Sequence, residues 1–386
     1  MPRVVHLTVA HDPRDPRIVH KQCRTLHEAG YALTLVAPTV AAPVRPPVPW
    51  HPLPGDCSRL RRLGAALRGA SGLNADVYHI HDPDLLPVAY VLRRRTGARV
   101  IYDMHEDFRS HRSGLVGRLI RTVERWAFGW LDHVVLAERG YRPILTGETV
   151  PHTCIENYHR PYADTHVSPA ASNGPFRLLY TGSISRSRGL VHMLDVAQRL
   201  KADARPERLS LVGICRPDEQ RAAAQQRIRR EGLDAVVDRT GWTRYVPPET
   251  MPTHYRKADV GVALFQPIPN HMRSLLTKFY EYLHYGLPIL ASDVPLWRRF
   301  VETHDCGAVV PPGDAAAVLR VLDRWHANPA RFQTLVANAR RVSERFRWHV
   351  MAQRLLDLYG RLVGAPGGRS RALDRGYGVA GASDCA

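Results

Sequence analysis

The sequence predicts an α/β protein made of two Rossmann-like, doubly wound domains that face one another across a cleft. Short apolar runs typical of buried strands alternate with amphipathic helical runs along almost the whole chain. The alternation restarts after a Ser/Ala/Asn/Gly/Pro-rich segment near the middle, and 386 residues are enough for two domains of ordinary size. Strand–helix–strand units of this spacing form parallel sheets with right-handed crossovers. A ligand is then expected between the two domains.

The domain boundaries follow from these shifts in pattern. We expect a first domain at 1–168, a linker at 169–176 and a second domain at 177–346. A last helix at 347–364 is expected to cross back to the first domain. The Gly/Arg/Ser-rich tail at 365–386 has the composition of a disordered segment.

Bulk composition narrows the class of protein. The hydrophobic content of 44% and charged content of 23% are those of a soluble globular protein. No apolar run is long enough to cross a membrane and the N-terminus starts directly as a strand, so we expect a chain that is neither secreted nor membrane-spanning. The six cysteines are scattered without a C-x-x-C pair, which argues against a zinc site and indicates a reducing cytoplasm.

The formal net charge of +18 indicates acidic partners. Nucleotide phosphates, an anionic membrane surface and nucleic acid all fit a basic protein. Arginine supplies nearly all of this charge, which is compatible with a biased genome, so the charge by itself selects none of the three.

In the first half, three strands each end in a loop that carries acidic residues and histidine. The expected elements are strands 4–9, 32–36, 77–80, 100–102 and 133–136, helices 18–29, 58–68 and from about 85, and an irregular proline-rich connection over 38–54. The loops are His11-Asp12-Pro13-Arg14-Asp15-Pro16-Arg17, His81-Asp82-Pro83-Asp84 and Asp103-Met104-His105-Glu106-Asp107. Because carboxyl ends of parallel strands share one edge of a sheet, the three loops are expected to converge where doubly wound sheets bind ligands.

A helix over 114–131 has two interpretations. Leu115, Leu119, Val123, Trp126 and Trp130 recur at three-to-four spacing, with Arg112, Arg118, Arg121 and Arg125 among them. The favoured interpretation is a packed amphipathic helix with a basic outer face. The alternative is a helix whose basic residues and tryptophans rest on anionic lipid.

The second half repeats the alternation. Strands are expected at 178–180, 209–212, 260–264, 289–291 and 308–310, and helices at 190–202, 218–231, 248–256, 314–326, 329–346 and 349–362. The loop Thr181 to Gly189 places Arg186 and Arg188 among small residues between a strand and a helix. Small residues allow close backbone approach and arginine makes forked hydrogen bonds to phosphate, so this loop is a candidate diphosphate site, although a solvated turn has the same composition.

The stretch from Asn270 to Asp293 joins a polar loop, a short helix that opens at Thr277, a Gly-Leu-Pro turn and a buried strand. Thr277 is expected to be the N-cap, which puts Lys278 in the first turn, where free N–H groups and the helix dipole favour an anion. Glu281 lies about one turn further on, where its carboxylate is placed to bind a diol such as ribose. An ordinary capped helix with solvated charges is the competing interpretation.

Taken together, these residues resemble the retaining family 4 glycosyltransferases of GT-B fold, and are most similar to bacterial members from exopolysaccharide and cell-surface glycan clusters. The motifs that carry the resemblance extend over 1–362 in the family's order. They are Asp15-Pro16-Arg17-Ile18 with Lys21-Gln22-Cys23-Arg24, Tyr78-His79-Ile80-His81-Asp82-Pro83-Asp84-Leu85-Leu86-Pro87, Ile101-Tyr102-Asp103-Met104-His105-Glu106, Tyr180-Thr181-Gly182 with Arg188-Gly189, Lys278-Phe279-Tyr280-Glu281-Tyr282 and Gly286-Leu287-Pro288.

The resemblance implies transfer of a sugar from a nucleotide diphosphate sugar, UDP-hexose or UDP-N-acetylhexosamine, with retention of configuration and no metal or other cofactor. The acceptor would be a hydroxyl of a glycan, of a lipid-linked saccharide at the inner membrane face or of a soluble natural product. The implied catalytic residues are His105, Arg188 and Lys278. The implied donor-binding residues are Arg186, Gly213, Trp242, Ser274, Leu275, Leu276, Thr277 and Glu281, and the implied donor or acceptor contacts are Arg17, His81, Asp82 and Glu106.

The chain departs from the family pattern in three places. Arg273 stands where many relatives carry the first of two glutamates, Arg188 stands where lysine is common, and His11-Asp12-Pro13 replaces a frequent Gly-Gly. Two alternatives stay open: a nucleotide-sugar 2-epimerase of the same fold, and a non-enzymatic basic protein that binds membrane or nucleic acid. No aromatic-interleaved basic motif favours nucleic acid.

Overall fold

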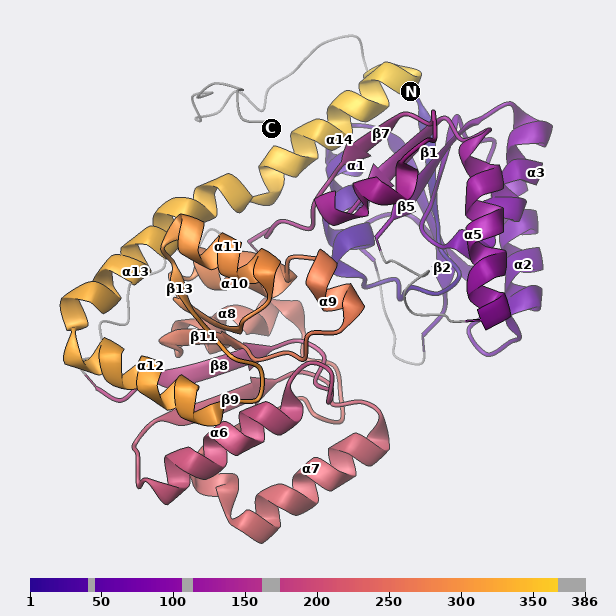
Figure 1. Ribbon diagram of the computed structural model, residues 1–386. Helices are drawn as coiled ribbons and strands as arrows, with labels where there is room; N and C mark the ends of the chain where they lie inside the picture. Colours follow the sequence, from indigo (N-terminus) through magenta and orange to yellow (C-terminus); the bar gives the residue numbers. More distant parts are fainter. Residues whose placement is uncertain (41–45, 106–113, 162–173, 367–386) are drawn as a thin grey trace.

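The computed structural model describes residues 1–40, 46–105, 114–161 and 174–366, and it consists of two α/β lobes (Figure 1). Each lobe is built on one parallel sheet, and the long last helix extends from the second lobe onto the first. The predicted fold class of two Rossmann-like domains is therefore confirmed.

The first sheet has seven strands in the order β3-β2-β1-β4-β5-β6-β7, all parallel. Its strands are β1 (Arg3–Leu7), β2 (Ala32–Pro38), β3 (Trp50–Leu53), β4 (Val77–Ile80), β5 (Arg99–Met104), β6 (His133–Leu136) and β7 (His152–Cys154). The helical segments are η1 (Pro16–Cys23), α1 (Arg24–Glu28), α2 (Arg59–Ser71), η2 (Pro83–Leu85), α3 (Leu86–Thr96), α5 (Gly114–Phe128) and η3 (Arg139–Leu145). The strand order reverses between β1 and β4, so the loops after these two strands flank the switch point at which such sheets bind ligands.

The second sheet has six parallel strands in the order β10-β9-β8-β11-β12-β13. They are β8 (Arg177–Thr181), β9 (Arg208–Val212), β10 (Val237–Thr240), β11 (Val260–Ala263), β12 (Ile289–Ser292) and β13 (Gly307–Val310). The helical segments are α6 (Leu190–Ala202), α7 (Asp218–Glu231), η4 (Leu233–Ala235), η5 (Pro248–Thr250), α8 (Met251–Arg256), α9 (Pro269–Arg273), α10 (Thr277–His284), α11 (Pro295–His304), α12 (Ala315–Ala327), α13 (Pro329–Ser343), η6 (Glu344–Phe346) and α14 (Trp348–Val363). The switch point lies between β8 and β11.

Helix α14 connects the two lobes through polar contacts with the first one. Trp348 Nε1 donates a 2.8 Å hydrogen bond to Thr25 Oγ1, and eleven residues further on the Tyr359 hydroxyl lies 2.8 Å from Nδ1 of His79. Both contacts are buried. They fix the helix across the side of the first sheet.

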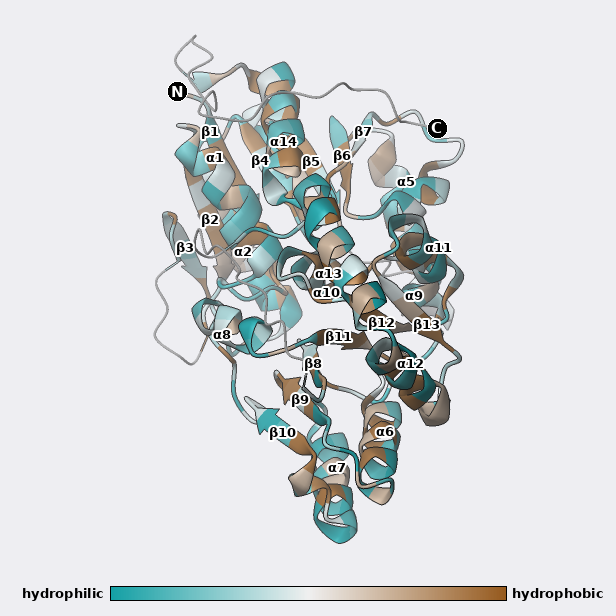
Figure 2. Cartoon of the chain, turned by 90° about the vertical axis from the view of Figure 1, so that its left-hand side faces the viewer, coloured by the Kyte–Doolittle hydropathy of each residue, from teal (hydrophilic) through white to brown (hydrophobic). Residues whose placement is uncertain are grey.

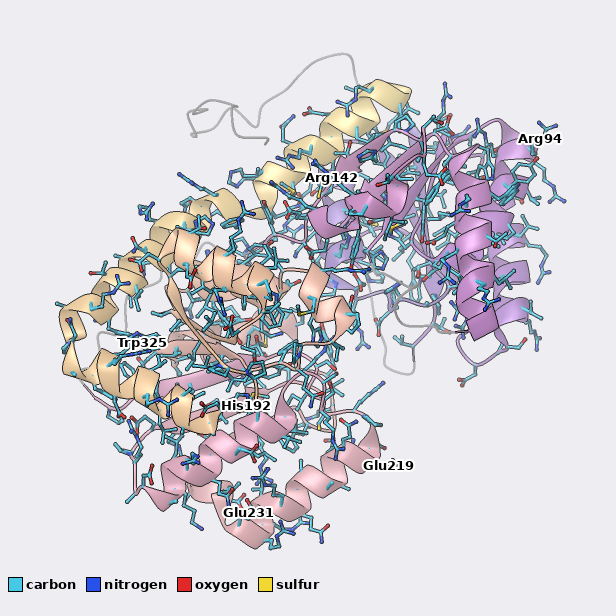
Figure 3. The ribbon with its side chains drawn as sticks, in the orientation of Figure 1. Arg94, Arg142, His192, Glu219, Glu231 and Trp325 are labelled. Atoms are coloured by element: carbon cyan, nitrogen blue, oxygen red, sulfur yellow. The ribbon has the colours of Figure 1, made fainter. Side chains whose placement is uncertain are left out.

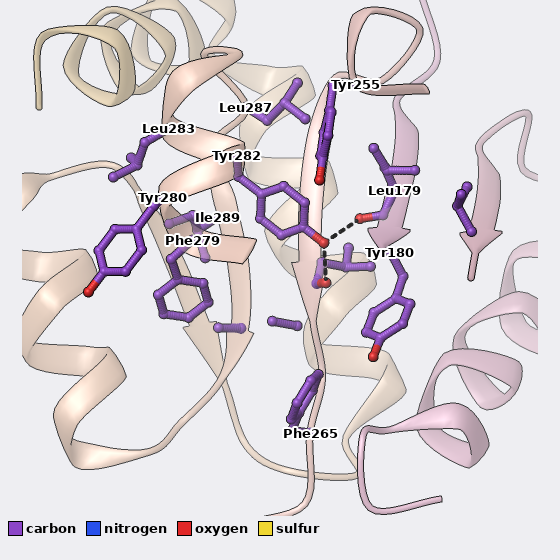
Figure 4. Close-up of a cluster of buried hydrophobic side chains, with 14 of the residues drawn as sticks. Leu179, Tyr180, Tyr255, Phe265, Phe279, Tyr280, Tyr282, Leu283, Leu287 and Ile289 are labelled. Carbon is purple, nitrogen blue, oxygen red and sulfur yellow. Dashed lines mark hydrogen bonds between the residues drawn. The ribbon is translucent and has the colours of Figure 1, made fainter. Parts of the chain in front are cut away.

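The core of the second domain surrounds Tyr282 of α10. Its ring is buried against Gly261, at which a Cβ would lie 2.3 Å from the ring, so only glycine fits opposite it. The Tyr282 hydroxyl donates to the carbonyls of Leu179 in β8 and Val262 in β11, at 3.1 and 3.0 Å (Figure 4). Coloured by hydropathy, β11 and β12 are brown while the outward sides of α11 and α12 are teal (Figure 2). This core therefore holds α10, and with it Lys278, in a fixed position over the sheet.

Several predictions about local structure were wrong. The proline-rich connection over 38–54 contains an edge strand, β3, which tolerates Pro52 because an edge strand need not donate on its outer side. The polar loop that begins at Asn270 lies within a short helix, α9, and helix α11 was not predicted. Thr277 is the first helical residue rather than the N-cap, a position that Leu276 occupies without a side-chain hydrogen bond.

Helix α5 also differs from the favoured interpretation. Leu119 is 64% exposed and Trp126 is 46% exposed, so the predicted apolar stripe is not fully packed. Its buried side instead includes Glu124, which accepts a 3.0 Å hydrogen bond from Tyr102. Glu124 thus lies on the packed side of the helix and pairs with the buried phenol of Tyr102, whereas Leu119 and Trp126 lie on the surface.

Candidate active site

The predicted site residues come from the carboxyl ends of the strands in both sheets. In the first domain they follow β1, β4 and β5, and in the second they follow β8, β9, β10 and β11. Glu106 lies outside the described residues. The two groups are described in turn, followed by the contacts that join them.

Asp103 is the buried centre of the first group. Arg17 donates to it from Nε and Nη2 at 3.1 and 2.9 Å, and Gln22 Nε2 donates at 2.6 Å. Although burial raises the pKa of Asp103, Arg17 and the neighbouring histidines outweigh burial and hold that pKa well below its usual value. The third arm of Arg17 donates to the Ile155 carbonyl, so this guanidinium is fully engaged and only 5% exposed. In this position Arg17 anchors Asp103.

Three fully buried histidines stack beside Asp103. His6 Nδ1 lies 2.9 Å from His81 Nε2, the His79 and His81 rings are stacked at 4.8 Å, and Tyr359 bridges His6 and His79. Burial is the main cause that lowers the pKa of all three, that of His81 to about 3, so they are neutral at pH 7. His81 therefore supports the site from behind and does not reach the surface.

His105 and His11 lie at the exposed end of this network. His105 Nδ1 is 3.2 Å from the Asp103 carbonyl oxygen, and its Nε2 is 2.9 Å from Nε2 of His11. His11 in turn lies 3.6 Å from Asp15 Oδ2 and 3.4 Å from Asp82 Oδ1. Asp82 is held by Val9 N–H and the Thr8 hydroxyl at 2.7 and 2.8 Å. Sequence reasoning identified His105 and Asp82, but it gave His11 no role.

Lys278 dominates the second group. It lies in the first turn of α10 and is 8% exposed, with its ammonium 5.0 Å from the ring centre of Tyr180 and 4.5 Å from that of Phe265. Burial and the nearby Arg188 lower its pKa to about 7, against the opposing effect of Glu281. A buried ammonium at a helix N-terminus is poised to gain a strong anionic partner.

The loop after β8 that carries Arg186 and Arg188 packs against the segment that follows β11. Arg188 is half-buried and interacts with the Tyr180 side chain, whereas Arg186 is exposed. A Cβ on Gly189 would lie 2.0 Å from the Leu264 carbonyl, and one on Gly213 would lie 2.0 Å from the Gly182 carbonyl. The glycines therefore permit the close backbone approach that was expected of this loop.

Glu281 is half-buried beside Tyr255. The Tyr255 hydroxyl donates a 2.6 Å hydrogen bond to Glu281 Oε2 and lies 3.3 Å from Thr181 Oγ1. One carboxylate oxygen is thereby oriented while the other remains available to a ligand hydroxyl. Trp242, placed near the base by the resemblance, is only 5% exposed and has the Arg239 guanidinium 6.0 Å from its ring.

Contacts between the domains converge on the loop that precedes α10. Glu138, after β6, accepts a 3.3 Å hydrogen bond from Leu275 N–H, and a Cβ on Gly140 would lie 2.2 Å from the Arg273 carbonyl. Asn157, after β7, donates a 3.1 Å hydrogen bond from Nδ2 to Thr277 Oγ1. On the second-domain side, Trp297 Nε1 donates to the Ser274 carbonyl at 2.8 Å. The loop of Ser274, Leu275 and Leu276 is thus held by both domains.

One further contact joins the domains near the site, and one contact within the first domain supports Asn157. The Arg14 guanidinium lies 4.8 Å from the ring centre of Tyr245, in the segment after Trp242. Lys21, on η1, donates to the Asn157 carbonyl at 3.1 Å; burial lowers its pKa to about 7, and the charge of Glu281 opposes that shift. Glu138, Asn157, Lys21 and Tyr255 were not predicted as site residues. A strand-end position was the one sequence signal available for Glu138 and Asn157.

Among the described residues, His79, His81 and Asp103 bring three potential metal ligands within 4.8 Å of one another. Both Asp103 oxygens already accept hydrogen bonds from Arg17 or Gln22. A cation would have to share this carboxylate with the Arg17 guanidinium, so the donor set does not fit a metal site. Within the described part of the chain, no helix combines the length and apolarity that a membrane crossing requires.

Two parallel-sheet domains, with buried histidines at the strand ends of one and with Lys278 and Arg188 at the starts of helices α10 and α6 of the other, form an α/β protein that carries cationic groups close to its domain boundary. Comparison with known proteins gives the family. The model for a glycosyl transferase 4-like domain matches residues 3–155, and the model for glycosyl transferases group 1 matches residues 175–328. The chain belongs to the family 4 glycosyltransferases of GT-B fold.

Individual relatives are distant. A D-inositol 3-phosphate glycosyltransferase of Thermomonospora curvata is 31% identical over 139 residues, which is 34% of this chain and 31% of that protein. The match therefore spans about a third of the relative's length. Sucrose-phosphate synthase from Thermosynechococcus elongatus superposes with a TM-score of 0.73 at 18% identity, covering 94% of this chain and 99% of that one. Anabaena Alr3699/HepE in complex with UDP and glucose gives 0.71 at 14% identity, covering 94% and 100%.

Proposed function

We propose that the protein is a retaining, metal-independent glycosyltransferase that moves a hexose or N-acetylhexosamine from a UDP-sugar to an acceptor hydroxyl. The observation that carries the proposal is Lys278, a nearly buried ammonium at the start of α10 with Arg188 beside it. Two cations this close disfavour each other, and a diphosphate would relieve that repulsion. In the transition state the same two groups would offset the charge that develops on the leaving diphosphate.

The remaining residues fit the other parts of a nucleotide sugar. Glu281, oriented by Tyr255, is placed to accept hydrogen bonds from ribose hydroxyls. The N–H groups of Leu276 and Thr277 at the start of α10 favour phosphate. His105 would contact the sugar from the first domain. UDP as the nucleotide is supported by the UDP complex of the similar Anabaena structure. We assign the attack to the acceptor hydroxyl on the face that the diphosphate leaves, without a protein nucleophile.

The surface of α5 favours a lipid-linked acceptor over a soluble one. Leu119 and Trp126 lie seven residues apart on one side of the helix, and the ring centre of Tyr90 of α3, 37% exposed, lies 5.0 Å from that of Trp126. Arg118, Arg121 and Arg125 are exposed on the same helix, and Arg94 extends from the neighbouring α3 (Figure 3). Exposed aromatic and aliphatic side chains among arginines suit the interface of an anionic membrane. We therefore place the enzyme in the cytoplasm, peripherally on the inner membrane face.

A release assay tests the activity. Purified protein is incubated with a panel of UDP-, GDP- and ADP-sugars, with lipid-linked and soluble acceptors, in the presence and absence of EDTA, and the released nucleotide and the product anomer are measured. We expect acceptor-dependent UDP release that EDTA leaves unchanged, and a product of the donor's configuration. Conversion of donor without acceptor would instead identify an epimerase. The absence of both turnover and nucleotide binding would refute the proposal.

Vesicle flotation tests the membrane assignment separately. Binding to vesicles with anionic lipid, but not to neutral vesicles, is expected for the wild type. Leu119→Ser with Trp126→Ser should abolish it while preserving UDP binding. As a matched control we use Leu60→Ser, which removes an 81% exposed leucine from α2. Equal flotation of all variants would leave the soluble acceptor as the better hypothesis.

A further inference from the structure

The hydrogen-bond partners of His105 define which of its nitrogens carries the proton. Nδ1 lies 3.2 Å from the carbonyl oxygen of Asp103, which accepts and never donates, so Nδ1 bears hydrogen. Burial lowers the pKa of His105, and the charges of His11 and Arg17 add to this effect against the opposing charges of Asp103 and Asp15, so the ring is neutral at pH 7. Its Nε2 is therefore a bare acceptor.

The partner of that acceptor is His11. His11 Nε2 lies 2.9 Å from His105 Nε2, so His11 must supply the hydrogen of this contact. Its other nitrogen, Nδ1, lies 3.6 Å from the carboxylate of Asp15, an ion-pair distance at which the negative charge favours hydrogen on Nδ1 as well. A histidine that carries hydrogen on both nitrogens is an imidazolium cation.

The surroundings of His11 stabilise this cation. Burial alone would lower its pKa, but Asp15 and Asp82 outweigh burial and raise the pKa to about 10. Asp15 is itself fixed, because its Oδ1 accepts from the N–H groups of Arg17 and Ile18 at the start of η1. Among the described residues, further charged groups near His11 include the Asp12–Arg14 pair of its own loop and the Arg17–Asp103 pair behind His105. His11 is 17% exposed, so its charge reaches the surface of the site.

Asp82 offers His11 a second acceptor. Asp82 Oδ1 is buried, lies 3.4 Å from His11 Nε2 and has no hydrogen bond of normal geometry within the described residues. The His11 N–H therefore donates to His105, which is nearer, and Asp82 Oδ1 is an alternative acceptor close to it. If a substrate hydroxyl donates to His105 Nε2, the His11 N–H can turn to Asp82 without losing its hydrogen bond.

We propose that His11 is a positioning residue: as an imidazolium held between Asp15 and Asp82, it donates to Nε2 of His105 and so keeps His105 in the tautomer that accepts a hydrogen bond from a sugar hydroxyl. The part of the inference that concerns sugar rests on the proposed function. The part that concerns the His11–His105 pair rests on the distances and on the burial and charges around the two rings. The first loop departs from the family pattern at His11-Asp12-Pro13, and the positioning of His105 gives this departure a function.

Nitrogen-15 NMR of the histidine-labelled wild-type protein tests the pair directly. At pH 7.5 we expect His105 as a neutral ring with hydrogen on Nδ1, the less common tautomer, and His11 with hydrogen on both nitrogens. Signals are assigned with His11→Gln and His105→Gln. A neutral His11, or His105 with hydrogen on Nε2, would overturn the proposal.

Two substitutions extend the test to turnover. His11→Leu removes the donor, so we expect kcat to fall about tenfold, the size of effect typical of a hydrogen bond to a charged group, with a mixed tautomer at His105. His11→Gln retains a neutral N–H donor and should recover most of kcat. The exposed His27→Gln serves as a control and should behave as the wild type.

The two kinds of measurement separate this inference from the proposed function. If no donor is turned over but the NMR pattern is present and is lost in His11→Leu, the pair stands and the proposed function fails. If turnover is found and His11→Leu keeps the wild-type kcat and the Nδ1–H tautomer, His11 does not position His105 and the inference fails.

Discussion

Asn157, at the end of the first sheet, donates a 3.1 Å hydrogen bond to the hydroxyl of Thr277, the first residue of helix α10. Thr277 precedes Lys278, so the bond connects the first domain to the helix that we propose binds the diphosphate. Lys21 holds the other side of Asn157 through its backbone carbonyl. The two domains are therefore in contact at the proposed donor site.

A double-mutant cycle measures this connection. We expect Asn157→Ala and Thr277→Val each to weaken UDP binding about fivefold, the effect of one neutral hydrogen bond of about 1 kcal/mol. Because both changes remove the same bond, the double variant should be no weaker than either single variant. Isothermal titration calorimetry with UDP gives the affinities, and strictly additive losses would show that the bond does not contribute.

Replacement of Lys278 should affect both rate and pH dependence. Lys278→Met is expected to lower kcat at least about 100-fold, because it removes a buried charge that stabilises the leaving group. Because the pKa of Lys278 is about 7, its ammonium group is charged below pH 7 and loses its proton above pH 7. UDP affinity should then fall as pH rises above 7, by up to tenfold per unit. The affinity of Lys278→Arg, which stays charged, should lack this fall, whereas an unchanged slope in this variant would assign the proton to another group.

The orientation of Glu281 by Tyr255 predicts a graded series. Tyr255→Phe loses the 2.6 Å hydrogen bond but keeps the carboxylate, so we expect UDP affinity to fall about fivefold. Glu281→Ala loses the ribose contact as well and should fall further. Comparison of UDP with 2′,3′-dideoxy-UDP gives the decisive control, because the dideoxy ligand should bind the wild type and Glu281→Ala equally.

Gly213 should tolerate no side chain. Its φ is +141° and a Cβ would lie 2.0 Å from the Gly182 carbonyl, so Gly213→Ala combines backbone strain with a clash. We expect a loss of about 3 kcal/mol or more in the free energy of unfolding. Gly182→Ala is the matched control: its φ is +103°, but a Cβ would meet no described heavy atom within 4 Å, so strain alone predicts about 1–2 kcal/mol. Equal losses in urea denaturation would rule out the clash.

Much of the fold could be predicted because hydrophobic periodicity and strand spacing are local signals. The bounds of α6 and α7 were predicted to the residue. Strand-end reasoning placed His105 and Asp82 at the edge of the first sheet, and the start of a helix placed Lys278 in the first turn of α10. The short strand β3 escaped prediction because its proline and flanking prolines resemble a loop. Its assignment depends on pairing with β2, which lies outside the local sequence.

The residues that the sequence did not reveal act through contacts of long range. Glu138 lies 137 positions from Leu275 and Asn157 lies 120 positions from Thr277, so neither belongs to a motif. The burial of Arg17 and His81 likewise depends on how neighbouring strands pack. The resemblance implied that both residues contact the donor or the acceptor, and in the structure both are buried beside Asp103.

Glu138 provides a prediction about stability and pH. Burial and the nearby Glu156 raise its pKa to about 8, against the opposing effects of Leu275 N–H and Arg17. A carboxyl group whose pKa rises on folding makes its full contribution to the free energy of unfolding below its unfolded pKa. This contribution is lost as pH rises through the folded pKa of about 8. Stability should therefore fall between pH 5 and pH 9.

Glu138→Gln stays neutral and still accepts from Leu275, so at pH 9 it should exceed the wild type by on the order of 2 kcal/mol in the free energy of unfolding. Urea denaturation at both pH values measures this, with the exposed Glu302→Gln as the control. A pH profile that is identical in Glu138→Gln and the wild type would show that Glu138 is ionised in the folded protein without cost.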